Sequence, residues 1–453
     1  MKIVIVGTGN VGSTIATQLS NAGHNITVLD TSEEAVRQIA QASDVMGMVG
    51  SGMSLPTLLD AGVAEADLVI AVTDSDEKNL LSCLMAKKAG TKNTIARVRN
   101  PEYKEEIEFM QADLGLSMSV NPELSAADEI ARLLKLPNAM EIDTFANGRV
   151  ELLKFEVTKD SPICGVTLKN LHNVLKTDVL MCVVERGNET MIPKGDFTIW
   201  EGDRVSFVAS GKKATQFFKA LNMNQGRARS VIIVGGGDTC FYLAKNLLNS
   251  GTEVKIIEKN KERCEELAEF LPDAIIINGN GTDKDLLSEE GIEYTDGFVT
   301  LTNHDEQNVV MALYAKKVNP KAKLITKLHK NVYDDIMDDL SIGSIINSKL
   351  IAAEAVVKYV RAMNNCLGSS METLYQLNAG KAEAMEFIVK KESRLLGVEL
   401  KDLDIKPDVI ISCIIHKGMV ETPGGHSKIR EGDSVIIVTT ETGIEELDQI
   451  LAV

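Results

Sequence analysis

The order of elements in the first thirty residues constrains the fold more than any other feature. An apolar, β-branched run at 2–6 breaks at the glycine-rich segment 7–12, which reads GTGNVG. An amphipathic segment follows, and then a second apolar run that ends on Asp30. Strand, glycine turn, helix, strand and carboxylate in this order are typical of a dinucleotide-binding βαβ unit. The opening residues therefore predict a Rossmann-like domain.

Each glycine of this motif has its own role. Gly7 permits the tight turn, Gly9 lets the backbone approach a pyrophosphate, and Gly12 allows the helix to pack close to the strand. The helix N-terminus offers unpaired N–H groups and a positive dipole end to phosphates. Asp30 is placed to accept hydrogen bonds from ribose hydroxyls, and its charge would repel a 2′-phosphate. NAD(H) or another adenosine ligand is thus favoured over NADP(H).

Composition excludes several classes of function. No apolar run reaches the roughly 18 residues that a bilayer span needs. The seven cysteines form no CxxC pair and the six histidines lack metal-ligand spacing, so we expect reduced thiols in a cytosol and no metal site. The net charge of −17 argues against nucleic acid and against an anionic membrane as direct partners. The negative charge is compatible with docking onto a basic surface of another protein, and simple solubility explains it equally well.

Strands and helices alternate up to about residue 134, which predicts a doubly wound parallel sheet with ligands at the carboxyl ends of its strands. Thr31 and Glu34 suggest a capping box for the second helix, and Pro101 is expected to open another helix. Further strands are expected at 45–49, 68–72, 94–98 and 117–120. From about residue 150, short β-like runs at 151–157, 179–185 and 204–209, with one helix near 164–171, predict a small, mostly antiparallel α+β domain.

The chain then repeats itself at an offset of 228 residues. The segment 231–237, VIIVGGG, restates the opening, and Glu258 restates Asp30. The small domain recurs as well. We therefore expect four units, which are a Rossmann domain and a small domain, twice. Their predicted bounds are 1–137, 138–222, 228–366 and 370–453.

The two predicted nucleotide sites are not equivalent. In the second, Asp238 replaces Asn10 at the helix start, where a carboxylate opposes anion binding. Cys240 replaces Gly12 and adds volume to the close helix–strand contact. We therefore expect the first site to bind NAD(H) tightly, and the second to bind it weakly or to take a less anionic ligand.

Two charged segments allow both a structural and a functional interpretation. The acidic run at 74–77 lies at the carboxyl end of a strand, near where an adenine or a cation could bind, but its acids also suit the first turn of a helix. Arg97 and Arg99 are two residues apart at a strand end. They could meet phosphates or a carboxylate across a subunit contact, or they could be exposed strand-end charges.

No convergent catalytic set accompanies the nucleotide motif. His172, His304 and His416 are isolated in the sequence, and no nucleophile triad is suggested. Dehydrogenases pair a Rossmann domain with a catalytic domain, whereas here the partner domain is small, β-rich and duplicated. We therefore predict that the chain is not an enzyme.

Several stretches together resemble the TrkA family, the cytosolic regulatory subunits of bacterial and archaeal Trk potassium uptake systems. They are VGTGNVG, its second copy VGGGDTC, IARVRNPEY at 95–103, and the pair SPICGVTL and SRLLGVEL with their EGD turns. The resemblance covers essentially the whole chain. The four units look like tandem RCK (KTN) domains, each with its small C-terminal domain.

The resemblance implies a regulatory role. Members assemble as rings, here expected to be a homotetramer, that lie on the cytoplasmic face of the membrane beneath a potassium channel or transporter subunit of Trk type. NAD(H), with ATP or ADP as competing ligands, binds the Rossmann clefts and changes the shape of the ring. Ser51 and Asn280 depart from the pattern, because many RCK domains have Asp there.

Carried over by position, the cofactor-binding residues of the first copy are Gly7, Thr8, Gly9, Asn10, Val11, Gly12, Asp30, Ser51, Thr73, Asp74 and Arg97. Those of the second copy are Gly235, Gly237, Asp238, Glu258, Asn280, Thr302 and Lys327. Two alternatives remain open at this point: an NAD-dependent dehydrogenase or reductase with a divergent second half, and a soluble nucleotide sensor without a membrane partner.

Overall fold

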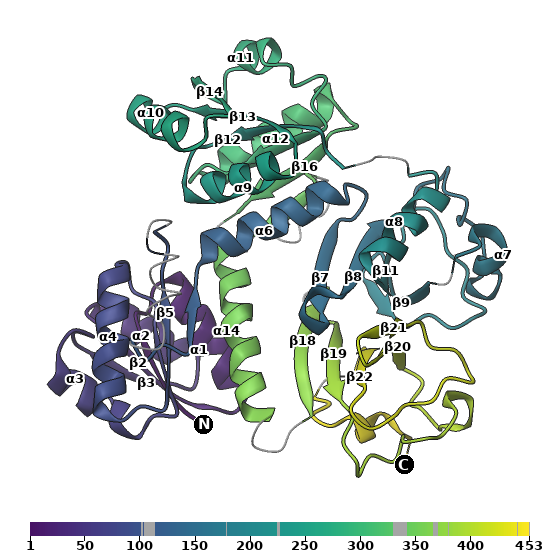
Figure 1. The fold of residues 1–453 in the computed structure, drawn as a ribbon, viewed down its shortest axis with the longest axis horizontal. Helices are drawn as coiled ribbons and strands as arrows, with labels where there is room; N and C mark the ends of the chain where they lie inside the picture. Colours follow the sequence, from purple (N-terminus) through teal and green to yellow (C-terminus); the bar gives the residue numbers. More distant parts are fainter. Residues whose placement is uncertain are drawn as a thin grey trace. The chain divides into compact units, whose positions relative to one another are not determined.

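The computed structural model describes residues 1–100, 103, 114–177, 179–223, 227–328, 342–365, 370–378, 380–441 and 443–452. The chain divides into two compact units, one of residues 1–131 and 229–357, the other of residues 132–228 and 358–453. Each unit therefore combines a segment from the first half of the chain with the equivalent segment from the second half (Figure 1).

A parallel sheet of six strands in the order β3-β2-β1-β4-β5-β6 forms the first half of unit 1. Apart from the exposed Lys2 at the start of β1, the central strands β1 and β4 are apolar and buried, as strands covered by helices on both faces must be. The strand order reverses between β1 and β4, and ligands of doubly wound sheets bind outside this point. The elements are β1 (Lys2–Val6), α1 (Asn10–Asn21), β2 (Asn25–Asp30), α2 (Glu33–Ala42), β3 (Met46–Val49), α3 (Leu55–Asp60), β4 (Leu68–Ala71), α4 (Asp76–Ala89), β5 (Asn93–Arg97), β6 (Met118–Val120) and α6 (Pro122–Lys135).

The second half of unit 1 repeats this topology. Its six parallel strands follow the order β14-β13-β12-β15-β16-β17, with the same reversal between β12 and β15. The elements are β12 (Ser230–Val234), α9 (Asp238–Asn249), β13 (Glu253–Glu258), α10 (Lys261–Phe270), β14 (Ile275–Asn278), α11 (Lys284–Glu289), β15 (Gly297–Thr300), α12 (Asp305–Val318), β16 (Lys323–Lys327), β17 (Ser344–Ile346) and α14 (Ser348–Asn365).

Unit 2 contains two antiparallel sheets of five strands that share one apolar core. Phe145 and Cys182 of the first sheet lie in the same buried cluster as Leu377 and Cys413 of the second. The sheet orders are β10-β9-β11-β8-β7 and β18-β19-β22-β20-β21. Their strands are β7 (Glu141–Phe145), β8 (Val150–Glu156), β9 (Leu180–Arg186), β10 (Glu189–Met191), β11 (Arg204–Ala209), β18 (Met371–Leu377), β19 (Ala382–Ile388), β20 (Val409–His416), β21 (Met419–Glu421) and β22 (Ser434–Thr439).

The predicted fold class, two parallel Rossmann-like domains with small α+β domains, is confirmed, whereas two local predictions are wrong and two elements were not predicted. The cap of α2 is Ser32, whose side chain accepts from the N–H of Ala35, and not Thr31. The helix expected near 164–171 begins only at Leu171, with α7 (Leu171–Leu175), and a 3₁₀ turn precedes it. Strand β7 and helix α8 (Gly211–Ala220) were not predicted.

Two further observations concern the described residues alone. The helix predicted from Pro101 lies outside them. Within them, no helix combines the length and the apolar composition that crossing a bilayer requires.

Candidate nucleotide-binding clefts

A first cleft of about 550 Å³ lies at the carboxyl ends of the strands of the first sheet. Cavities of this size are typical of small-molecule sites. Nine residues predicted from the sequence line it: Gly7, Gly9, Asn10, Val11, Asp30, Ser51, Thr73, Asp74 and Arg97. Thr8 and Gly12, also predicted, belong to the same glycine loop but are not among the residues that line the cleft.

The glycine loop between β1 and α1 has the geometry that a phosphate cradle needs. Gly7 has a φ of +100°, and a Cβ atom there would lie 2.9 Å from the backbone nitrogen of Thr73. A Cβ atom on Gly12 would lie 1.9 Å from the carbonyl oxygen of Gly7, so helix and strand are in backbone contact. A Cβ atom on Gly9 would meet nothing within 4 Å, so the loop is open to a ligand at this residue.

The Asp30 carboxylate fastens the glycine loop to the end of β2. One oxygen accepts from the N–H of Thr8 (2.6 Å) and from the Thr8 hydroxyl (3.0 Å), and the other accepts from the N–H of Ser32 (2.9 Å). Partial burial acts to raise the pKa of Asp30, but these hydrogen bonds outweigh it and hold the pKa below its usual value of 3.8. The group is therefore an ionised acceptor at neutral pH.

A buried asparagine, which the sequence reasoning did not identify as functional, ties the next two strand ends together. Asn79 accepts from the N–H of Thr73 (2.7 Å) and from the Thr73 hydroxyl (2.7 Å), and it donates to the carbonyl of Arg97 (3.0 Å). Asn308 makes the equivalent bonds in the second copy, to Thr302 and Lys327. Its recurrence at matching places in the repeat was the available signal.

The acidic run at 74–77 is mainly structural. Ser75 caps α4. Asp76 is buried and accepts from the N–H groups of Arg99 (2.8 Å) and Asn100 (2.9 Å). Asp74 is exposed, pairs with Lys78 at 3.2 Å and reaches the edge of the cleft. The structural interpretation therefore holds for Ser75 and Asp76, and the functional one stays a prediction for Asp74 alone.

The two arginines at and just after the end of β5 pair with different carboxylates. Arg97 pairs with Glu123, the second residue of α6, at 3.3 Å, and both side chains are largely buried. Arg99 lies 3.6 Å from Asp76. The interpretation of Arg97 as an exposed strand-end charge is therefore wrong, and Glu123 is a cleft residue that the sequence reasoning missed.

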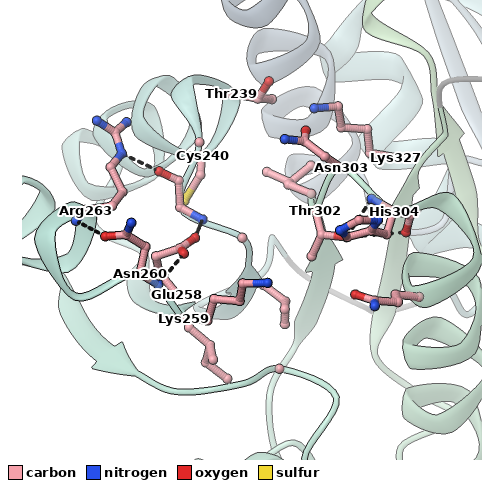
Figure 2. A pocket seen from close by; sticks show the side chains of 18 of the residues that line it. Thr239, Cys240, Glu258, Lys259, Asn260, Arg263, Thr302, Asn303, His304 and Lys327 are labelled. Atoms are coloured by element: carbon pink, nitrogen blue, oxygen red, sulfur yellow. Dashed lines mark hydrogen bonds between the residues drawn. The ribbon is translucent and has the colours of Figure 1, made fainter.

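A second cleft, of about 610 Å³, occupies the equivalent place in the second sheet. Figure 2 shows Glu258, Asn260 and Arg263 on one wall and Thr302, Asn303 and Lys327 on the other. All predicted residues of the second copy line it: Gly235, Gly237, Asp238, Glu258, Asn280, Thr302 and Lys327.

An arginine that has no counterpart in the first copy modifies the second glycine loop. Arg263 stands where the first copy has Ala35. Its Nε donates to the carbonyl of Gly236 (2.7 Å), and its guanidinium lies 3.3 Å from Asp238. The unfavourable charge of Asp238 toward phosphate is thereby partly compensated. Glu258 keeps the role of Asp30, since it accepts from the N–H of Gly236 at 2.7 Å.

Each cleft also takes residues from the other half of the chain. Lys327 and Lys349 line the first cleft, whereas Arg99 and Glu123 line the second. The halves of unit 1 are joined beside the clefts by the Tyr242 hydroxyl, which lies 3.0 Å from the Asn121 amide and donates to the Arg99 carbonyl at 3.0 Å. Sequence spacing gives no signal for such long-range contacts.

Comparisons with known proteins agree with this architecture. The TrkA-N domain model matches residues 3–118 and 231–348, and the TrkA-C domain model matches 152–222 and 384–452. The Trk system potassium uptake protein TrkA homolog of Archaeoglobus fulgidus is 33% identical over 99% of this chain and 100% of its own length. The Trk system potassium uptake protein TrkA of Haemophilus influenzae is 30% identical over 99% of this chain and 98% of its own.

Among solved structures, the RCK domain of GsuK superposes with a TM-score of 0.62 at 15% identity, covering 97% of this chain and 92% of that one. The GsuK channel bound to NAD superposes with a TM-score of 0.61 at 15% identity, covering 97% and 77%. Fold and clefts thus define a duplicated RCK-type protein, with two Rossmann-like and two small domains. The full-length relatives and the domain models place it further: the chain belongs to the TrkA family.

Proposed function

We propose that this chain is the regulatory subunit of a Trk-type potassium uptake system. In this proposal NAD(H), in competition with ATP or ADP, binds the Rossmann-like clefts and changes the shape of a homotetrameric ring. The ring lies in the cytoplasm against the inner face of the membrane and gates a potassium channel or transporter subunit. The domain bounds 1–137, 138–222, 228–366 and 370–453 are part of the same proposal.

One observation carries the nucleotide part of the proposal. In the first cleft, an open glycine loop at a helix N-terminus and an ionised ribose acceptor lie on the same 550 Å³ cavity. N–H groups at a helix start suit a pyrophosphate, and a carboxylate at the end of the second strand suits a ribose 2′-hydroxyl. NAD(H) fits these residues better than NADP(H), because Asp30 would repel a 2′-phosphate.

The regulatory part rests on the relatives, which are named potassium uptake proteins and align over nearly their full length. A ligand shifts a protein between two shapes only by its differential affinity for them. Couplings of about 1–3 kcal/mol are typical, and several clefts in one ring would add their contributions. In this role the nucleotide is a signal and is not consumed.

Calorimetric titration of the purified chain with NADH and with NADPH tests the proposal. We expect NADH to bind, NADPH to bind at least tenfold more weakly at the first cleft, and Asp30→Ala to weaken NADH. Asp44→Ala, which removes an exposed acid outside the cleft, is the matched control. Absence of NADH binding would overturn the proposal, and steady oxidation of NADH with a metabolite substrate would favour the dehydrogenase alternative.

A further inference from the structure

Glu123 and Lys327 have an unusual position, because each of them lines both clefts of unit 1. Lys327 at the end of β16 is the counterpart of Arg97 at the end of β5. Glu123 is the second residue of α6, and its counterpart in α14 is Lys349. These two pairs of equivalent positions hold three cationic side chains, and Glu123 is the one carboxylate among the four.

Glu123 makes an ion pair with one cation and lies in the same two linings as a second, Lys327. One of its oxygens accepts from the Arg97 guanidinium at 3.3 Å. Its other oxygen is buried and makes no hydrogen bond within the described part of the chain. Burial lowers the pKa of Lys327, and the negative charge of Glu123 opposes this effect. The carboxylate thus pairs directly with Arg97 of the first cleft, and its charge acts on Lys327, which lines both clefts.

We infer that Glu123 is a counter-ion shared by the two clefts, and that it makes an anionic nucleotide in one cleft weaken the binding of a nucleotide in the other. This inference rests on the proposed function, since it requires nucleotides to occupy the clefts. It adds a coupling between the clefts, and it assigns that coupling to one side chain.

The coupling follows from where the charges can go. A phosphate in the first cleft competes with Glu123 for Arg97. The released carboxylate, which is buried, is then compensated by Lys327, because leaving it unpaired is costly. Lys327 thereby offers less positive charge to an anion in the second cleft. The reverse sequence holds for a nucleotide that arrives in the second cleft first, as linkage requires.

The size of the effect is set by burial. Arg97 and Glu123 side chains are 15% and 18% exposed, so their interaction is poorly screened by water and salt. Allosteric couplings between sites are typically about 5- to 150-fold in affinity. We expect the affinity of one cleft for NADH to fall at least about fivefold when the other cleft is filled.

Calorimetric titration of the full chain with NADH tests this inference. Glu258→Ala disables the second cleft, and so it reports the affinity of the first cleft without a neighbouring ligand. Asp30→Ala disables the first cleft and so reports the affinity of the isolated second cleft. In the unmodified chain the two binding steps should differ in affinity by more than these two isolated clefts do. Glu123→Gln keeps the shape of the side chain and removes its charge, and it should reduce the coupling to about one. Lys327→Met, which removes the cation that lines both clefts, should reduce it as well.

Asp128→Asn is the matched control, because it neutralises another carboxylate of α6, one that bonds Asn246 at 3.2 Å and lines neither cleft. It should leave the coupling unchanged. Coupling that persists in both Glu123→Gln and Lys327→Met would overturn the inference, as would two clefts that bind NADH independently in the unmodified chain. Either result leaves the proposed function standing, whereas a chain that binds no NADH at all refutes the proposed function itself.

Discussion

Replacing Gly12 by cysteine gives the first glycine loop the residue that the second loop already has. The Cβ atom of residue 12 would lie 1.9 Å from the carbonyl oxygen of Gly7 and 3.1 Å from a methyl group of Val72. Real Cβ contacts essentially never fall below 3.0 Å. The start of α1 must therefore move away from β1 by roughly 1 Å, which forces overpacking of a close backbone contact.

Two consequences of this movement can be estimated. Overpacking costs about 1–3 kcal/mol of stability, which lowers the Tm by roughly 2–12 °C in a domain of this size. The N–H groups of the helix start also lose their alignment with a bound pyrophosphate. Hydrogen bonds to charged groups contribute about 1.5–3 kcal/mol each. Losing one therefore lowers the affinity for NADH by roughly 10- to 100-fold.

Differential scanning calorimetry and NADH titration of the Gly12→Cys chain measure both effects. Gly9→Ala is an informative control, because its Cβ atom meets no protein atom within 4 Å. It should leave the Tm unchanged and still weaken NADH, since the added methyl group faces the ligand. If Gly12→Cys kept both the Tm and the NADH affinity of the unmodified chain, the proposed close contact and its role in binding would be refuted.

Three further predictions follow from the contacts. Asp30→Ala removes the acceptor for the N–H groups of Thr8 and Ser32 as well as for the ribose. NADH titration should show an affinity loss of about tenfold or more. An unchanged affinity would contradict the role of Asp30 as the ribose acceptor. Asn79→Ala leaves buried partners at two strand ends unsatisfied, so urea denaturation should show a loss of about 2–3 kcal/mol in the free energy of unfolding, whereas a loss below 0.5 kcal/mol, estimated roughly as for a surface site, would speak against the network. Burial lowers the pKa of Lys323 to about 7. Between pH 7 and about 10.4 the unfolded chain therefore binds a proton that the folded chain lacks. The free energy of unfolding thus rises with pH by up to about 1.4 kcal/mol per pH unit. Lys323→Met should therefore stabilise the chain most below pH 7, and an equal effect at pH 6 and pH 10 would contradict this.

The fold of the first half could be predicted because it follows from local patterns of apolar runs and turn residues. Strand β1 has the predicted bounds, and each of the other parallel strands predicted in the first half begins or ends within about one residue of its prediction. The strands are apolar runs between turn residues, and the helices between them leave only a parallel sheet. The repeat then carried the whole topology over to the second half. Which of two neighbouring hydroxyl residues caps α2 depends on backbone geometry, and there the prediction failed.

The clefts were predictable where they are built from consecutive motifs and not where distant segments meet. Gly7, Asp30 and Thr73 each end a strand or follow its end, so the sheet brings them together. Glu123 and Arg263 carry no motif. Their importance comes from ion pairs with residues more than twenty positions away, which only the folded chain reveals.

In the proposed function, NAD(H) controls potassium movement without being consumed. The most direct test places the chain and a Trk-type membrane subunit in vesicles, and follows potassium flux together with nicotinamide absorbance while NADH is added. We predict that the flux changes with NADH, that the absorbance stays constant, and that Asp30→Ala abolishes the response. A flux that is independent of NADH, or an absorbance that declines steadily as turnover proceeds, would contradict the account.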